Sequence, residues 1–393
     1  MQPIVFPRRF LFGAGICDYQ HFGGAVCDLP VIPAAKHSLY FEDDFKLLKK
    51  LRLNAFRSSI EWARIEPEEG KIDENSVKFY HDYFSELKKM GIATIVTLHH
   101  FTNPKWIHKY GGWLSRKTVE KFLRYVDFVS QAFDESIDYY VTINEPTIYA
   151  LLAYWYKGGE RGFPPYHKSP TEAKQCLRNM NEAIRGAYEI IHERSKKARV
   201  GVAQDCGALP LALQDWRGLL PWFMGKMPRS VVVNNQIDSW EGKFDFLGIN
   251  YYSKAFRGKQ RVYPEGLRKI CRVLFKKYRK PILITENGLP NRDDKQKTSY
   301  LVLHLKSVVD AITLDQAEII GYCWWSFLHG YEWGFGYKPF FALVDVDIDG
   351  SYKRKPTKTA HTYSKIIKDH GFSKDLYEKY HILESALRFE EWL

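Results

Sequence analysis

The sequence predicts a single (β/α)8 barrel. Short β-rich runs alternate with longer amphipathic stretches along the chain, and no linker or low-complexity segment divides its 393 residues. Such alternation is typical of parallel βαβ units, and eight units can close into a barrel. A doubly wound sheet is the structural competitor, but it usually has a Gly-rich first turn. No G-x-G-x-x-G motif follows the first run, so we expect one α/β barrel domain over residues 1–393.

Eight β-rich runs are expected to form the strands of this barrel. Parallel strands covered on both faces are typically apolar along most of their length, as these runs are. The runs are residues 10–15, 54–60, 93–100, 139–144, 199–204, 244–252, 281–286 and 321–327.

Amphipathic stretches between these runs predict the outer helices. In residues 42–51, Phe45, Leu48 and Leu51 recur every three residues and place one apolar stripe on a helix. Pro264 and Gly266 are expected to come just ahead of the helix at 267–278. The other predicted helices are residues 75–90, 118–133, 171–197, 299–312 and 356–370.

Two segments fall outside this alternation. Three prolines interrupt residues 205–241, which we expect to form an irregular connection between the fifth and sixth strands. Residues 372–393 are charged and partly helical in pattern, and we expect them to form a C-terminal tail packed on the barrel.

Composition excludes several classes of protein. Hydrophobic residues make up 45% of the chain and charged residues 26%, as in ordinary globular proteins. No apolar stretch approaches the roughly 20 residues that span a bilayer, and the N-terminus lacks a signal-peptide pattern. We therefore expect a cytoplasmic protein without a membrane partner. The six cysteines form no C-x-x-C pair and are not expected to form structural disulfide bonds.

The formal net charge of +12 raises the question of a nucleic-acid partner. The basic residues are scattered, however, and lie mostly on polar faces or ends of predicted helices, as Lys49, Lys88 and Lys276 do. No nucleic-acid-binding motif accompanies them. A solvated barrel exterior explains the charge, and we expect no nucleic-acid partner.

Barrel enzymes build their sites from residues at the C-terminal ends of the strands. Two carboxyls, Glu145 and Glu286, directly follow buried runs at the ends of strands four and seven. One such glutamate could be a structural ion-pair partner, but two at one barrel mouth, each beside an asparagine, indicate chemistry. The other polar candidates at strand ends are Gln20, Arg57, His99, His100, Asn144, Asn250, Tyr251, Tyr252, Asn287, Glu332 and Trp333.

Paired carboxylates suit glycoside hydrolysis, which needs a proton donor and a nucleophile or base. In the retaining reaction the two stand roughly 5–5.5 Å apart, and one forms a covalent glycosyl-enzyme intermediate. Repulsion from ionised Glu286 would keep Glu145 protonated near neutral pH. Arg57 and Tyr252 could hold Glu286 ionised and oriented.

The segments around both glutamates resemble the signatures of family 1 glycoside hydrolases. Residues 142–146 (TINEP) are similar to the acid/base signature, and residues 284–288 (ITENG) to the nucleophile signature. Further similar segments follow in family order, and the resemblance covers residues 8 to about 370. They are FLFG at 10–13, EWARI at 61–65, TLHHF at 97–101, YGGW at 110–113, DFLGINYY at 245–252 and WSFL at 325–328.

The resemblance implies a retaining β-glycosidase of β-glucoside or β-galactoside type, with Glu145 as acid/base and Glu286 as nucleophile. It implies that Asn144 binds the sugar 2-hydroxyl and that Trp325 is the stacking floor. A carboxylate at Glu332 would repel a 6-phosphate, so we expect unphosphorylated sugars. The remaining hydroxyls would be bound by Gln20, His100, Glu332 and Trp333, with Tyr252, Arg57, Asn250 and Phe341 in contact with the nucleophile or supporting the site.

The chain departs from the family pattern at a few positions. His329-Gly330 replaces the usual Asp-Asn, Phe340 replaces an Arg ahead of Phe341, and Arg178 replaces a His. The chain is also short, and the missing length falls around residues 205–241. We therefore expect a more open outer cleft. The preferred sugar, its aglycone and the oligomeric state are left open.

The sequence also allows three other interpretations of the site and its function. His99-His100 could suggest a metal site, but adjacent strand residues face opposite ways and no further ligands stand at metal spacing, so no metal or cofactor is expected. A sugar-binding relative without turnover predicts loss of one glutamate, and both are present. A transglycosidase would use the same intermediate with a sugar acceptor. The expected partner is a small-molecule or oligosaccharide β-glycoside.

Overall fold

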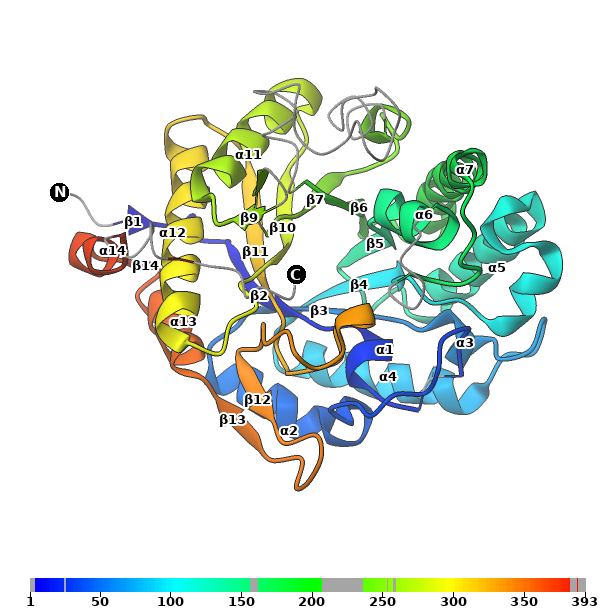
Figure 1. The fold of residues 1–393 in the computed structure, drawn as a ribbon, viewed down its shortest axis with the longest axis horizontal. Helices are drawn as coiled ribbons and strands as arrows, with labels where there is room; N and C mark the ends of the chain where they lie inside the picture. Colours follow the sequence, from blue (N-terminus) through cyan, green and yellow to red (C-terminus); the bar gives the residue numbers. More distant parts are fainter. Residues whose placement is uncertain are drawn as a thin grey trace.

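The computed structural model of the chain describes residues 4–24, 26–155, 162–206, 236–252, 254–256, 259–381 and 387. Its central feature is a closed barrel of eight parallel strands, in the order β2-β3-β4-β5-β6-β7-β10-β11 (Figure 1). The last strand, β11, pairs with the first, β2, from Gly321 opposite Leu11 to Trp325 opposite Gly15. The predicted (β/α)8 fold is therefore confirmed.

Each predicted run overlaps one barrel strand, with ends displaced by at most two residues. The strands are β2 Leu11–Gly15, β3 Ala55–Ser59, β4 Ala93–His99, β5 Tyr139–Asn144, β6 Arg199–Asp205, β7 Phe246–Asn250, β10 Ile282–Asn287 and β11 Ile319–Trp325.

Helices surround the barrel (Figure 1). Several begin with a side chain that accepts a hydrogen bond from a first-turn backbone N–H, as Asp73 does for α4 and Ser115 for α5. The helices are α1 Asp18–His21, α2 His37–Lys50, α3 Trp62–Ile65, α4 Glu74–Lys89, α5 Arg116–Ala132, α6 Pro146–Tyr154, α7 Pro170–Arg194, α11 Pro264–Tyr278, α12 Asp294–Thr313, α13 Lys358–Lys368 and α14 Lys374–His381, with short 3-10 turns η1 Lys105–Tyr110, η2 Gly112–Leu114 and η4 Trp333–Phe335.

The start of α11 differs from the sequence prediction. Pro264 is its first residue, and Gly266 lies inside its first turn instead of ahead of the helix. Proline suits this position because the first helical N–H needs no intrahelical partner. A Cβ on Gly266 would lie 2.2 Å from the Tyr251 hydroxyl oxygen, so the close approach of Tyr251 requires glycine there.

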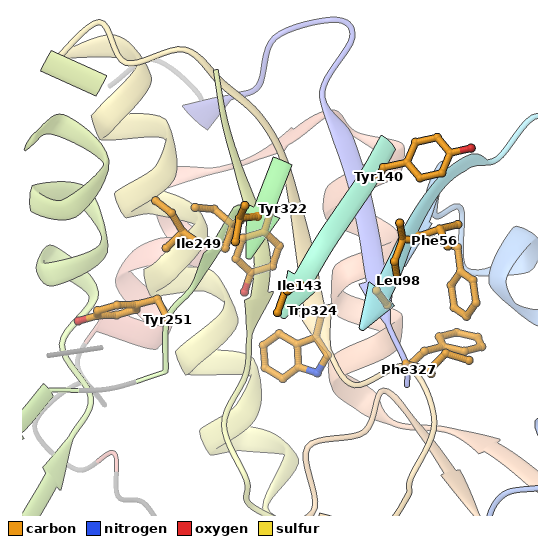
Figure 2. Packing of buried hydrophobic residues seen from close by; sticks show 14 of the residues in the cluster. Phe56, Leu98, Tyr140, Ile143, Ile249, Tyr251, Tyr322, Trp324 and Phe327 are labelled. Carbon is orange, nitrogen blue, oxygen red and sulfur yellow. The ribbon is translucent and has the colours of Figure 1, made fainter. Parts of the chain in front are cut away.

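The core has two layers. Inside the barrel lies a small cluster that includes Ala55, Val141, Ala203 and Phe246. A larger cluster fills the space between strands and helices. Figure 2 shows part of it: Phe56, Leu98, Tyr140, Ile143, Ile249, Tyr251, Tyr322, Trp324 and Phe327. Because apolar side chains fill the barrel interior, polar side chains of the strand ends are confined to its mouth.

Short two-stranded sheets complete the described structure. β1 (Ile4–Val5) pairs antiparallel with β14 (Gly371–Phe372), and β12 (Val344–Val346) pairs with β13 (Arg354–Pro356). The third sheet is β8 (Lys254–Phe256) with β9 (Lys259–Arg261). Helix α14 packs on α12, so the described part of the predicted tail is helical and lies on the barrel exterior. Most of the predicted irregular connection, residues 207–235, lies outside the described residues.

The exterior carries the basic residues as the sequence indicated. Lys49 and Lys50 end α2, Lys88 and Lys89 end α4, and all four side chains are exposed. Cations in the last turn of a helix are stabilised by its dipole. No helix among the described residues is long and apolar enough to cross a membrane. All six cysteines are buried and unpaired.

Candidate active site

Glu145 stands where β5 gives way to α6. Its backbone adopts the left-handed conformation (φ 44°, ψ 57°), and Pro146 begins the helix directly after it. The register with β6 shifts between Val141 and Asn144, so this strand end is bulged. Bulges beside active sites re-aim side chains, and a non-glycine residue in the left-handed region costs about 1 kcal/mol or more. The local backbone is thus specialised at Glu145.

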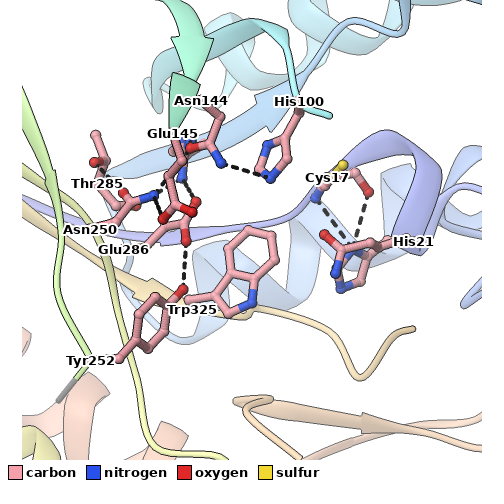
Figure 3. Close-up of polar contacts among 12 residues, drawn as sticks. Cys17, His21, His100, Asn144, Glu145, Asn250, Tyr252, Thr285, Glu286 and Trp325 are labelled. Atoms are coloured by element: carbon pink, nitrogen blue, oxygen red, sulfur yellow. Dashed lines mark hydrogen bonds and ion pairs between the residues drawn. The ribbon is translucent and has the colours of Figure 1, made fainter. Parts of the chain in front are cut away.

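Glu286 occupies the corresponding end of β10. The register with β7 shifts between Ile284 and Glu286, so β10 is also irregular at its C-terminal end. The Glu286 backbone carbonyl accepts a hydrogen bond of 2.9 Å from the N–H of Tyr251. Figure 3 shows the carboxyls of Glu145 and Glu286 turned toward each other at the barrel mouth.

Glu286 receives strong donors on both oxygens. A guanidinium nitrogen of Arg57 forms a buried ion pair with Oε1, and the Tyr252 hydroxyl donates to Oε2 at 2.5 Å. A cation and a phenol donor both favour negative charge on a carboxyl group. Burial is the largest cause of the raised pKa of Tyr252, so this hydroxyl keeps its proton and acts as a donor.

Two asparagines connect the glutamates. Asn250 Nδ2 donates to Glu145 Oε1 at 2.7 Å and to Asn144 Oδ1 at 3.1 Å. Arg57 Nη2 donates to the same Asn144 oxygen at 2.7 Å. The hydroxyl of Thr285 donates to Asn250 Oδ1 at 2.7 Å, which fixes the amide nitrogen of Asn250 toward Glu145.

Glu145 has a different environment from Glu286. Burial raises its pKa well above the ordinary value, and the negative charges of Glu286 and Asp205 raise it further. The amide of Asn250 and the charge of Arg57 oppose this effect only in part. From the sequence, repulsion by Glu286 was expected to raise the pKa of Glu145. Burial is the larger cause. The two carboxyls are therefore unlike: the pKa of Glu145 is raised well above its ordinary value, whereas Glu286 is ion-paired with Arg57.

Gln20, Trp325 and Glu332 form a second polar group beside the two carboxyls. The Trp325 indole N–H donates to Glu332 Oε1 at 3.1 Å, and Gln20 Nε2 donates to Glu332 Oε2 at 3.3 Å. Burial raises the pKa of Glu332 to about 8. Among the described residues, Gln20 Oε1 has no hydrogen-bond partner although it is buried. A buried acceptor left open at a barrel mouth is suited to a ligand hydroxyl.

His100 links this group to the carboxyls. Its Nε2 lies 3.3 Å from Asn144 Nδ2, and its ring stacks at 5.8 Å from Trp325 and 6.0 Å from Trp333. Burial lowers the pKa of His100, so the ring is neutral. His99 points the other way, with its Nε2 3.0 Å from Asn103 Oδ1 behind the strand. Only one of the adjacent histidines enters the mouth, as strand geometry predicted.

The structure brings most of the predicted site residues together at one barrel mouth. His99, Tyr251 and Asn287 lie behind the strands instead, where the Tyr251 hydroxyl donates to the Tyr263 carbonyl oxygen and Asn287 Nδ2 donates to the Tyr300 hydroxyl. Phe341 belongs to the mouth through an edge contact with the Tyr252 ring, with centroids 5.6 Å apart. Among the described residues, no group of three or more His, Cys, Asp and Glu is placed to hold a metal ion. Sequence reasoning missed Thr285, which orients Asn250, and Asp205, which follows the predicted fifth strand by one residue. In the sequence Asp205 looks like part of a polar loop, and its place in the site follows from the pairing of β6 with β7.

Two of the departures from the family pattern, His329 and Phe340, pack together, whereas Arg178 lies on α7. The Phe340 ring lies 4.9 Å from the His329 ring and 4.2 Å from the Lys297 ammonium nitrogen. Gly330 must lack a Cβ because such an atom would lie 2.6 Å from His21 Nε2. Phe340 therefore packs with His329 and Lys297, and Gly330 packs against His21.

A closed parallel barrel with two unlike carboxyls and a buried aromatic wall at its mouth defines the glycosidase class of barrel proteins. A sequence model of glycosyl hydrolase family 1 matches residues 32–214 and 257–372, and the chain belongs to this family.

The chain is 30% identical to the chloroplastic β-glucosidase-like SFR2 of Oryza sativa subsp. japonica and to the chloroplastic galactolipid galactosyltransferase SFR2 of Arabidopsis thaliana. Each match covers 86% of this chain, which spans 57% and 59% of those two proteins. The β-glycosidase from Pyrococcus horikoshii is 28% identical, with a TM-score of 0.85 over 96% of this chain and 98% of that chain.

Proposed function

We propose that this protein is a retaining β-glycosidase that releases terminal, non-reducing β-linked sugars by double displacement. The carrying observation is the contrast between its two carboxyls. Arg57 and Tyr252 stabilise negative charge on Glu286, while burial and like charges keep Glu145 protonated. A nucleophile and an acid with opposite protonation states are what the first displacement needs.

In the first step, a carboxylate oxygen of Glu286 attacks the anomeric carbon of the bound sugar. The bond from this carbon to the glycosidic oxygen breaks, and Glu145 gives its proton to that oxygen. The aglycone leaves as an alcohol, and the sugar remains as an ester on Glu286. Asn144, fixed by Arg57 and Asn250, is placed to bind the 2-hydroxyl at this stage.

In the second step, water takes the place of the aglycone. Glu286 has lost its charge on esterification, so one cause of the high pKa of Glu145 is removed, and Glu145 is now a carboxylate. It accepts a proton from water, whose oxygen attacks the anomeric carbon. The ester bond breaks, free Glu286 carboxylate returns, and Glu145 is protonated again.

We propose that the substrate is an unphosphorylated β-glucoside or β-galactoside. Gln20, His100, Glu332 and Trp333 would bind its hydroxyls, and Trp325 would lie under the ring. Glu332 supports this choice because its oxygens accept from Trp325 and Gln20, with no cation among their partners to neutralise a phosphate. The names of the relatives, which include β-glucosidase and galactosyltransferase, are consistent with these sugars.

The nucleophile is tested by trapping. The protein is incubated with a 2-deoxy-2-fluoro β-glucoside carrying a good leaving group, digested, and analysed by peptide mass. A fluorosugar on Glu286 is expected, and the Glu286→Gln variant should stay unlabelled. Labelling at another residue of the active protein would overturn the assignment. A panel of aryl β-glucoside, galactoside, fucoside, mannoside and glucuronide then ranks the sugars.

Transfer to a sugar acceptor is the second candidate, favoured by the relative named a galactolipid galactosyltransferase. It differs only in which hydroxyl captures the ester on Glu286. Products are therefore measured with and without added sugar acceptor at constant donor concentration. Free sugar released at an unchanged rate identifies a hydrolase, whereas a new glycoside formed at the expense of free sugar identifies a transferase.

A further inference from the structure

Asp205 is a third carboxylate at the barrel mouth. It is the last residue of β6, where its register partner on β7 is Asn250. Ala203, two residues earlier, belongs to the cluster inside the barrel. Because side chains alternate along a strand, Asp205 also faces the barrel axis, one layer above Ala203. Its side chain is only partly buried.

The neighbours of Asp205 on both strands contact Glu145. Its register partner Asn250 donates to Glu145 Oε1 at 2.7 Å, and the Glu145 backbone N–H donates to the Ala203 carbonyl at 2.7 Å. β6 lies next to β5, so Asp205 and Glu145 end neighbouring strands. The negative charge of Asp205 is among the causes that raise the pKa of Glu145, after burial and Glu286.

Other groups also act on Glu145 electrostatically. Glu286 adds negative charge from β10, and Arg57 adds positive charge from β3. A negative charge on Glu145 is among the causes that raise the pKa values of the Tyr252 hydroxyl and the buried Cys206 thiol. Both groups therefore stay neutral. Glu286 is neutralised by the sugar ester during the proposed reaction, but Asp205 is not. Asp205 therefore differs from Glu286 in that its charge persists through both steps.

We propose that Asp205 is a positioning residue of this reaction, acting on Glu145 through its negative charge. The proposal rests on the proposed function. In the first step the charge holds the proton on Glu145, and in the second it makes the Glu145 carboxylate a stronger base toward water. A charge with these two effects extends the active range toward alkaline pH.

The test is the pH dependence of kcat/KM for an aryl β-glucoside with a poor leaving group. Asp205→Asn should move the alkaline limb down by about half a unit to one unit, because a charge several ångströms away contributes on this scale. Asp205→Glu should keep the limb near its original position. Asp127→Asn, which removes an exposed carboxylate on α5 paired with Arg194, is the matched control and should leave the limb unchanged.

The shift should shrink in high salt, since the Asp205 side chain is partly exposed. If Asp205→Asn does not fold, Asp205→Ser removes the same charge with a smaller side chain. An unchanged alkaline limb in a folded, uncharged variant would overturn the proposal. The proposal would also be overturned if Asp205→Asn changed only KM, by an amount that differs among leaving groups. That result would mean that Asp205 binds the aglycone. Failure of the proposed function itself would appear separately, as absence of fluorosugar on Glu286 in the unmodified protein.

Discussion

Tyr252 donates its hydroxyl to Oε2 of Glu286 at 2.5 Å, while its own ring is held by an edge contact with Phe341. The phenol therefore presents a fixed donor to the proposed nucleophile. Replacing Tyr252 by Phe removes this donor and leaves the ring contact. We expect kcat/KM to fall about 10- to 1000-fold, as for the loss of one preorganised donor in an active site.

This expectation is measured by steady-state kinetics and by the rate of fluorosugar labelling at Glu286. Both should fall together, because the donor acts on the group that is labelled. Tyr331→Phe is a control at the same mouth, since the hydrogen bond from Gln20 goes to the Tyr331 backbone carbonyl and survives the change. A Tyr252→Phe variant that labels at the original rate would contradict the role of this donor.

Glu145→Ala removes the proposed proton donor. The loss should depend on the leaving group, because a good leaving group needs no protonation. We expect about 100- to 10,000-fold slower glycosylation for alkyl leaving groups, the usual range for general acid catalysis, and a much smaller loss for dinitrophenyl. Glu332→Gln, which alters a hydroxyl-binding residue, should slow both substrates alike. Equal losses in Glu145→Ala would count against an acid role.

The buried carboxyl of Glu332 predicts a pH-dependent stability. Burial raises its pKa from 4.5 to about 8 in the folded protein. Between these values the folded state binds more protons than the unfolded state, so stability falls as pH rises. Glu332→Gln lacks this titration. As the pH rises from 4.5 to 8, the free energy of unfolding of Glu332→Gln minus that of the wild type should increase by about 1–3 kcal/mol.

Thermal or urea unfolding at several pH values measures this difference. Groups common to both proteins cancel in the comparison. Glu318→Gln, which changes an exposed carboxyl ahead of β11, is the control for a change from Glu to Gln. A difference for Glu332→Gln that is constant with pH would mean that Glu332 ionises at its ordinary pH in the folded protein.

Gly288 couples the strand of Glu286 to the aromatic floor. A Cβ at this position would lie 2.1 Å from the Trp325 carbonyl oxygen. Gly288→Ala should therefore displace Trp325, destabilise the fold by about 1–3 kcal/mol and lower kcat/KM. Gly70→Ala is the control, because a Cβ there meets nothing within 4 Å and only its φ of +78° is strained. Unchanged kinetics in Gly288→Ala would show that Trp325 can adapt.

The sequence predicted the strands well because barrel strands are apolar and short. The errors lie at the strand ends. Several runs were predicted longer than the hydrogen-bonded strand, while β6 and β10 extend one residue beyond their predicted runs and β11 begins two residues earlier. Tyr251 and Tyr252 were expected in the sixth strand but follow β7, which ends at Asn250. Helix α2 begins at His37, five residues before its expected start at Glu42. Its first turn is fixed by a buried bond between His37 and Asp44, at 2.8 Å, which apolar periodicity cannot reveal.

The candidate site was predictable wherever a short motif surrounds a chemical group. Glu145 and Glu286 were found in this way, and their roles stay predictions. Asp205 was not found, because a single acid after a strand looks like part of a polar loop. Only the pairing of β6 with β7 shows that it shares a layer with Asn250. The importance of burial for Glu145 also depends on packing in three dimensions, which no local motif records.

The bulged ends of β5 and β10 have a practical consequence for engineering. Both proposed reacting groups are anchored by hydrogen bonds among barrel strands, from Arg57 on β3 through Asn144 to Asn250 on β7. These bonds run between residues of the barrel strands, and Tyr252, just after β7, adds one more to Glu286. Connections from homologues can therefore be grafted onto this barrel to change its acceptor preference. The spacing of the two carboxyls should stay as it is in the barrel that receives them.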